Sequence, residues 1–179
     1  GINERDACTQ TSVEIQYPNC TFRNRGLLAG VAGTEEGQAA ASMGVDAGDF
    51  DNDGDDDLLM SELNGEGSNL YVNSGKGLFD DHGAASALGP LTLPFTGFGT
   101  AWIDADNDGW LDVLSVNGRV QASEGDTRGP FPLAQRKLLF RNMANGRFED
   151  VSARAGEAFP GAEGGRGAAF GRHQQRGAP

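Results

Sequence analysis

Two short stretches rich in aspartate carry the side chains best suited to chemistry. Both follow the spacing Asp-x-Asp-x-Asp-Gly-x-x-Asp, once over residues 49–57 and again over residues 104–112. Hard cations such as Ca²⁺ prefer six to eight oxygen ligands, and alternate side chains of a tight loop can converge on one ion. A glycine at the sixth position permits the sharp bend, and the carbonyl of the seventh position then points inward. The pattern therefore predicts two calcium ions, one in each stretch.

The predicted ligands occupy the same five positions in each stretch. In the first they are Asp49, Asp51, Asp53, the carbonyl of Asp55, and Asp57. In the second they are Asp104, Asp106, Asp108, the carbonyl of Trp110, and Asp112. Mg²⁺ fits less well because it seldom uses ligand cages made only of protein. Zn²⁺ would prefer His or Cys, and neither residue lies in the two stretches.

Two other interpretations explain the spacing less well. The helical calcium hand shares the first half of the pattern but needs a glutamate at position 12, where this chain has Met60 or Ser115. Solvated acidic turns without an ion would leave four carboxylates repelling one another within nine residues. Because this crowding occurs twice with the same glycine, the sequence favours a bound cation.

The acidic stretches belong to a longer internal repeat. Each is followed by a hairpin pattern, residues 69–81 and residues 137–150, that ends in Phe-Asp-Asp or Phe-Glu-Asp. Each unit therefore predicts a strand, the acidic loop, a second strand and a hairpin. Four short strands match one propeller blade. We expect an all-β fold of tandem four-stranded antiparallel, blade-like repeats of the β-propeller type, incomplete in this chain.

The repeat divides the chain into four parts. We expect a segment at 1–40 that ends with the tail of a preceding repeat, two repeats at 41–96 and 97–160, and the start of a further, degenerate or truncated repeat at 161–179. In the last part Arg172, Gln174 and Arg176 replace the acidic residues, so no ion is expected there. We hypothesise that this end is truncated or shifted in frame. The insertion Asn117–Gln135 predicts a surface loop, with binding as a hypothesis.

Composition limits the partners and the compartment. The net charge of −12 argues against nucleic-acid binding, and no apolar run reaches the length of a membrane span. Cys8 and Cys20 predict a disulfide, with two free thiols as the alternative, and Asn19 lies in a glycosylation sequon. We therefore expect an extracellular, periplasmic or cell-surface location.

Residues 44–55 and 99–113, with the hairpin ends Gly-Leu-Phe-Asp-Asp and Gly-Arg-Phe-Glu-Asp, resemble FG-GAP repeats of the VCBS type. The chain is similar to the bacterial ASPIC/UnbV and cartilage-acidic-protein-like group. The resemblance implies a propeller blade with Ca²⁺ in the loop between its first two strands, secretion, and a role in adhesion or matrix. A closed propeller has several more blades than these two complete units.

The sequence thus predicts a secreted calcium-binding module, not an enzyme, with a structural, adhesion or surface-assembly role. Its protein or glycan ligand stays unidentified. Open sheet edges favour pairing between copies, so a homo-oligomer or filament is a further hypothesis. The alternative is a non-catalytic accessory domain of a larger secreted enzyme that acts on polysaccharides.

Overall fold

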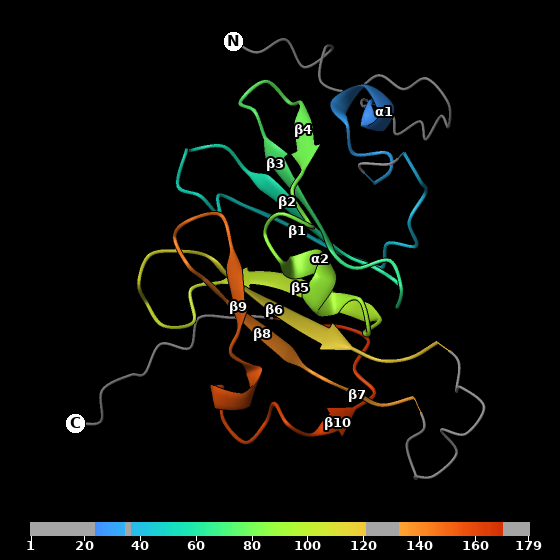
Figure 1. Ribbon diagram of the computed structural model, residues 1–179, viewed down its shortest axis with the longest axis vertical. Coiled ribbons are helices and arrows are strands. Elements are labelled where there is room, and N and C mark those ends of the chain that lie inside the picture. The colour runs from blue at the N-terminus through green and yellow to red at the C-terminus, as the bar shows by residue number, and fades with distance from the viewer. Residues whose placement is uncertain (1–23, 35–36, 121–132, 170–179) are drawn as a thin grey trace, which may run out of the picture.

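Two four-stranded antiparallel sheets are the main elements of the described chain (Figure 1). The computed structural model describes residues 24–34, 37–120 and 133–169. The first sheet, blade 1, consists of β1 (Gly44–Gly48), β2 (Asp57–Ser61), β3 (Asn69–Asn73) and β4 (Phe79–Asp81). The second sheet, blade 2, consists of β5 (Gly97–Ile103), β6 (Asp112–Asn117), β8 (Leu138–Asn142) and β9 (Phe148–Asp150). The predicted all-β fold of four-stranded antiparallel units is therefore confirmed.

Smaller elements connect and flank the blades. They are α1 (Gly26–Ala29), α2 (Leu88–Thr92), the 3-10 turn η1 (Ser152–Arg154), and a two-stranded sheet of β7 (Gln135–Arg136) with β10 (Ala162–Glu163). The helices in the described part of the chain are too short or too polar to cross a bilayer. Several predictions fall outside the described residues, namely the Cys8–Cys20 disulfide, the Asn19 sequon, most of the Asn117–Gln135 insertion, and Arg172, Gln174 and Arg176.

Strand register places an apolar surface of each blade against the other blade. In blade 1, Leu59 of β2 lies opposite Leu70 of β3, and both side chains are buried. In blade 2, Val113 of β6 lies opposite Phe140 of β8, and both are likewise buried. All four residues belong to one hydrophobic core cluster. Because side chains alternate along a strand, each sheet has one apolar surface, and the two apolar surfaces pack together into a single core between the sheets.

Three aromatic rings join the two blades at the end of the sheets that carries the acidic loops. Phe50 stacks on Trp102 and on Phe148, with ring centroids 6.0 Å apart in both pairs, and Trp102 lies 6.1 Å from Phe148. Such pairs contribute about 0.5–1.5 kcal/mol each beyond the burial of their area. Phe50 is the second residue of the first acidic loop. The loop is therefore anchored directly in the core between the blades.

The first strands of the two blades approach each other closely. The backbone N–H of Trp102 in β5 donates a hydrogen bond of 2.9 Å to the carboxylate of Asp46 in β1. A side chain at Gly44 would lie 2.8 Å from the carbonyl oxygen of Phe98, so only glycine allows this contact. At the equivalent position of blade 2, a Cβ on Gly99 would lie 2.8 Å from the backbone nitrogen of Ala168. The segment near Ala168 thus lies beside β5 much as β5 lies beside β1.

Candidate metal centres

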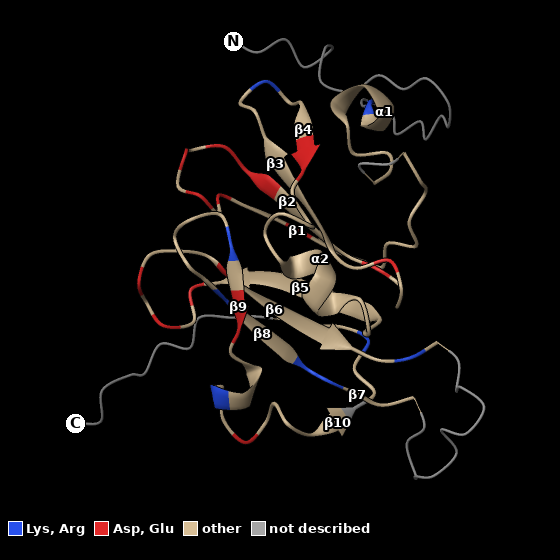
Figure 2. Ribbon diagram, viewed as in Figure 1, with Lys and Arg blue, Asp and Glu red and all other residues tan. Residues whose placement is uncertain are grey.

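The two acidic loops connect the first and second strands of their blades. Loop 1, residues 49–57, joins β1 to β2, and loop 2, residues 104–112, joins β5 to β6. Figure 2 shows both acidic loops on the same side of the molecule. The amide of Asn52 in loop 1 donates a hydrogen bond of 3.4 Å to the carbonyl of Gly109 in loop 2. The two candidate sites are therefore neighbours.

The first aspartate of each loop receives the backbone N–H groups of the bend. Asp49 accepts hydrogen bonds of 3.0 Å from the nitrogens of both Asp53 and Gly54. Its counterpart Asp104 accepts them from Asp108 at 3.0 Å and from Gly109 at 3.2 Å. Loops of the same sequence pattern thus form the same local hydrogen bonds.

Backbone dihedral angles explain the residue types at two positions of the loops. The φ angles of Gly54 and Gly109 are +96° and +87°, in a region that favours glycine. These positive angles form the sharp bend that the sequence predicts for the sixth position of each loop. Asn52 and Asn107 also have positive φ angles, +61° and +59°. Asparagine tolerates this left-handed conformation better than most residues. The asparagine shared by the fourth position of both loops is therefore a further sequence signal for this bend, beyond the aspartates and the glycine.

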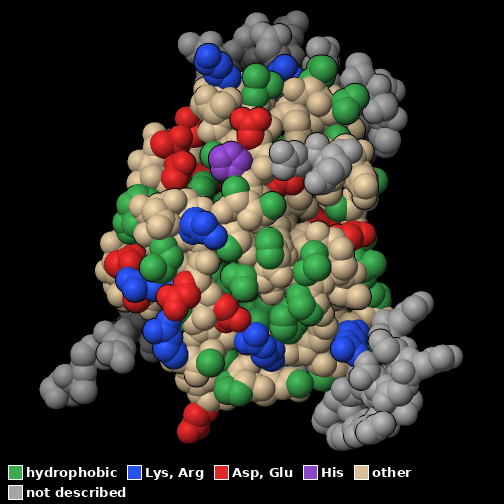
Figure 3. Space-filling model, viewed as in Figure 1, with side chains coloured by type: hydrophobic (Ala, Val, Ile, Leu, Met, Phe, Trp, Pro, Cys, Tyr) green, Lys and Arg blue, Asp and Glu red, His purple; other side chains and the backbone are tan. Residues whose placement is uncertain are grey.

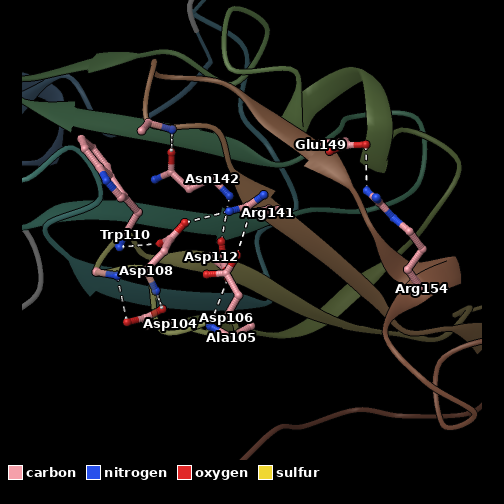
Figure 4. A network of polar contacts seen from close by, with 12 residues as sticks. Asp104, Ala105, Asp106, Asp108, Trp110, Asp112, Arg141, Asn142, Glu149 and Arg154 are labelled. Carbon is pink, nitrogen blue, oxygen red and sulfur yellow. Dashed lines mark hydrogen bonds and ion pairs between the residues drawn. The ribbon is translucent and has the colours of Figure 1, made fainter.

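The last aspartate of each loop connects the loop to the following hairpin. Asp57 accepts hydrogen bonds from the backbone nitrogens of Phe50 at 3.2 Å and Asn73 at 2.8 Å. Asp112 likewise accepts from Ala105 at 3.0 Å and from Asn142 at 2.8 Å (Figure 4). Both aspartates are almost fully buried. Each holds the start of its loop against the end of β3 or β8.

Two asparagines that the spacing of the acidic residues does not reveal complete this connection. The side-chain amide of Asn73 donates to the carbonyl of Asp56 at 3.1 Å, and that of Asn142 donates to the carbonyl of Leu111 at 3.1 Å. Asp56 and Leu111 occupy the same eighth position of their loops. The repeated asparagine at the end of each third strand is the sequence signal that could have found these residues.

Three carboxylates converge in each loop. Carboxylate oxygens of Asp49, Asp51 and Asp57 all lie within 4.8 Å of one another, as do those of Asp104, Asp106 and Asp108. Oxygens on opposite sides of a Ca²⁺ ion are about 4.6–5.2 Å apart, because each bond is about 2.3–2.6 Å long. The donor set and its spacing therefore fit one Ca²⁺ ion in each loop.

The other predicted ligands lie outside these two groups of converging carboxylates. Asp53 is not part of the first group, and its carboxylate accepts the backbone N–H of Asp55 at 2.9 Å. Asp112 is not part of the second group, although its two oxygens accept backbone N–H groups just as those of Asp57 do. Asp55 and Trp110, predicted to contribute backbone carbonyls, each follow the glycine of the bend. The two groups therefore share their first two positions and differ in the third.

Burial and mutual repulsion raise the pKa of two carboxylates in loop 1. The pKa of Asp57 is raised from its ordinary value of 3.8 to about 6, chiefly by burial and in smaller part by repulsion from Asp51 and Asp53. The N–H groups of Asn73 and Phe50 oppose this shift. Burial, followed by repulsion from Asp53, also raises the pKa of Asp51. A cation in this loop would relieve the repulsion and would compete with protons for the same oxygens.

Loop 2 differs because it has a positive side chain beside it. Nε of Arg141 lies 2.7 Å from Oδ2 of Asp106, and Nη2 lies 3.1 Å from Oδ2 of Asp108 (Figure 4). The pKa of Asp108 is lowered, chiefly by the N–H of Trp110 and then by Arg141. Burial raises the pKa of Asp112. The spacing of residues along the chain does not indicate that Arg141 lies against this loop.

Comparison with known families agrees with the arrangement of the loops. Residues 49–115 match the family model of the FG-GAP-like repeat. The matched stretch covers just over a third of the chain and contains both acidic loops and the hairpin of blade 1. This part of the chain is therefore similar to an FG-GAP-like repeat, while the narrower likeness to the ASPIC/UnbV group stays a prediction. None of the curated proteins matches the chain.

Proposed function

We propose that this chain is a calcium-binding repeat module in which two Ca²⁺ ions, one in each acidic loop, stabilise the two blades. The observation that carries the proposal is the convergence of three carboxylates in each loop within the diameter of a calcium coordination sphere. Carboxylates crowded in this way repel one another, and a divalent cation removes that repulsion.

The ions would act on folding before anything else. Loop 1 is tied to the core by Phe50, and each loop is tied to its hairpin by Asp57 or Asp112. An ion that orders the loop therefore also stabilises the contacts among the first three strands of the same blade. Binding free energy then contributes to the stability of the folded state.

The biological role that we propose is non-catalytic. The module would serve adhesion, matrix or surface assembly in an extracellular, periplasmic or cell-surface setting, through a protein or glycan ligand. The similarity of residues 49–115 to an FG-GAP-like repeat supports a repeat module of this kind. Assembly of copies through open sheet edges is a further hypothesis, and light scattering of a concentrated sample in Ca²⁺ would reject it by finding only monomers.

Calcium titration by calorimetry tests the proposed function, together with thermal unfolding in Ca²⁺ and in chelator. We expect two ions per chain and a large drop in melting temperature in chelator. Mg²⁺ at the same concentration is the control, and it should stabilise the protein less because it dehydrates reluctantly. No heat of binding and an unchanged melting temperature would show that the loops are only acidic turns.

A further inference from the structure

The two acidic loops differ at one position of the strand beside them. Asn73 and Asn142 occupy equivalent places, because each donates its backbone N–H to the last aspartate of its loop at 2.8 Å. The residue before this asparagine is Val72 in β3 and Arg141 in β8. The chain therefore contains two loops with the same spacing of aspartates, one beside a neutral side chain and the other beside a cation.

The guanidinium of Arg141 is bound by two of the three carboxylates that converge in loop 2. It lies 2.7 Å from Asp106 and 3.1 Å from Asp108, and both of these aspartates belong to the group that includes Asp104. A cationic group thus already interacts with this set of oxygens. Val72, partly buried against the core, offers loop 1 no such charge.

We propose that Arg141 is an internal competitor for the second cation site, so that loop 2 binds a divalent ion more weakly than loop 1. The inference rests on the proposed function of the loops. The guanidinium leaves Asp106 and Asp108 when the ion enters, because the ion needs the oxygens that the guanidinium contacts. The ion must therefore break both ion pairs of Arg141, and a guanidinium that stays within about 5 Å repels it; even in water, repulsion between a unit charge and a divalent ion at that distance lowers the affinity roughly tenfold.

The structure provides a place for the displaced side chain. Arg141 is 44% exposed, and its partner across the strands is Glu149 of β9. A cavity of about 310 Å³ beside loop 2 is lined by both residues. Figure 3 shows acidic and basic side chains close together on the surface of blade 2.

Glu149 can accept this new partner at little cost. Its carboxylate now pairs with Arg154 at 2.9 Å, and both side chains of that pair are exposed. Exposed ion pairs of this kind contribute little and exchange partners readily. Arg141 can therefore turn from the loop to Glu149 without leaving its charge unpaired.

The test follows each loop separately by NMR during a titration with buffered free Ca²⁺. The backbone amides of Gly54 and Gly109 report on loops 1 and 2, since each donates to the first aspartate of its own loop. In the unmodified protein we expect the Gly54 signal to reach its midpoint at roughly tenfold lower free Ca²⁺ than the Gly109 signal.

Two variants separate competition from a general effect of charge. Arg141→Gln should lower the midpoint at Gly109 roughly tenfold and leave the midpoint at Gly54 unchanged. Arg154→Gln is the matched control, because it removes the same charge from the same cavity without touching the loop. It should leave both midpoints within about twofold of their values in the unmodified protein.

Each other outcome has a definite meaning. Equal midpoints in the unmodified protein would overturn the inference, and so would a midpoint at Gly109 that stays the same or rises in Arg141→Gln. In the second case Arg141 orients the ligands instead of competing with the ion. If neither glycine responds in any variant, the proposed calcium function itself is wrong, and the inference falls with it.

Discussion

The side-chain amide of Asn142 donates a hydrogen bond of 2.8 Å to the carbonyl oxygen of Phe50, although 92 residues separate the two along the chain. The same amide nitrogen donates to Leu111, and the amide oxygen accepts the backbone N–H of Ala144 at 2.9 Å. One buried side chain of blade 2 therefore holds both acidic loops and its own hairpin turn. The equivalent side chain of Asn73 bonds to groups of its own blade.

Asn142→Ala should be the more damaging of the two asparagine substitutions. It leaves buried polar groups of both blades without partners, so we expect a loss of about 2–4 kcal/mol in the free energy of unfolding. Asn73→Ala is the matched control, with an expected loss of about 1–2 kcal/mol. Urea unfolding in saturating Ca²⁺ measures both. Equal losses would show that the bond between blades contributes nothing of its own.

Phe50→Ala should open a cavity between the blades. Its ring stacks on Trp102 and Phe148 in the core, so we expect a loss of about 3–5 kcal/mol in the free energy of unfolding. Because Phe50 also anchors loop 1, calcium binding to that loop should weaken. Leu78→Ala, at a side chain that is 51% exposed, is the control and should cost less than about 1 kcal/mol. A small loss in Phe50→Ala would contradict a shared core.

Removing one converging carboxylate should remove one ion. Asp51→Asn and Asp106→Asn each take a negative charge from one group, so calorimetry should find one bound Ca²⁺ per chain in place of two. Asp56→Asn makes the same chemical change at an exposed position outside both groups. This control should still bind two ions, and its losing one would mean that the ligand set has been assigned wrongly.

Glu62 should make the stability of the fold depend on pH near neutrality. Burial is the main cause that raises the pKa of this carboxyl from 4.5 to about 7, and Glu66 and Asp81 add repulsion. One of its oxygens accepts the hydroxyl of Ser42 at 2.7 Å, and the other has no hydrogen-bond partner among the described residues.

The direction of this pH dependence follows from proton linkage. The folded state holds this proton more strongly than the unfolded state, so the contribution of Glu62 to stability is fully present below about pH 4.5 and is lost as pH rises to about 7. Glu62→Gln should remove this loss and be more stable than the unmodified protein at pH 8 by on the order of 2 kcal/mol, with little difference at pH 5.

Chemical unfolding at several pH values, in saturating Ca²⁺, measures this difference. Glu157→Gln changes an exposed glutamate in the same way and should leave the pH profile unaltered. A difference between Glu62→Gln and the unmodified protein that is the same at pH 5 and pH 8 would show that the carboxyl does not titrate in this range.

Features that depend on local spacing could be predicted from the order of residues alone. Gly54 and Gly109 take the positive φ angles that the sixth position of the loop requires, and strand patterns of period two give four short strands on each repeat. These features arise from residues within a few positions of one another, so a repeated pattern is enough to predict them. The positive φ angles of Asn52 and Asn107 also depend only on their position within the loop.

Which distant groups meet at the loops depends instead on how the sheets pair and pack. Arg141 lies 33 residues after Asp108 and reaches loop 2 because antiparallel pairing of β6 with β8 brings it there. Phe50 enters a core that exists only when both blades pack, and Asn142 reaches it across the same interface. Such contacts are set by strand register and by the packing of one sheet against another. Neither is contained in the spacing of residues along a single strand or loop.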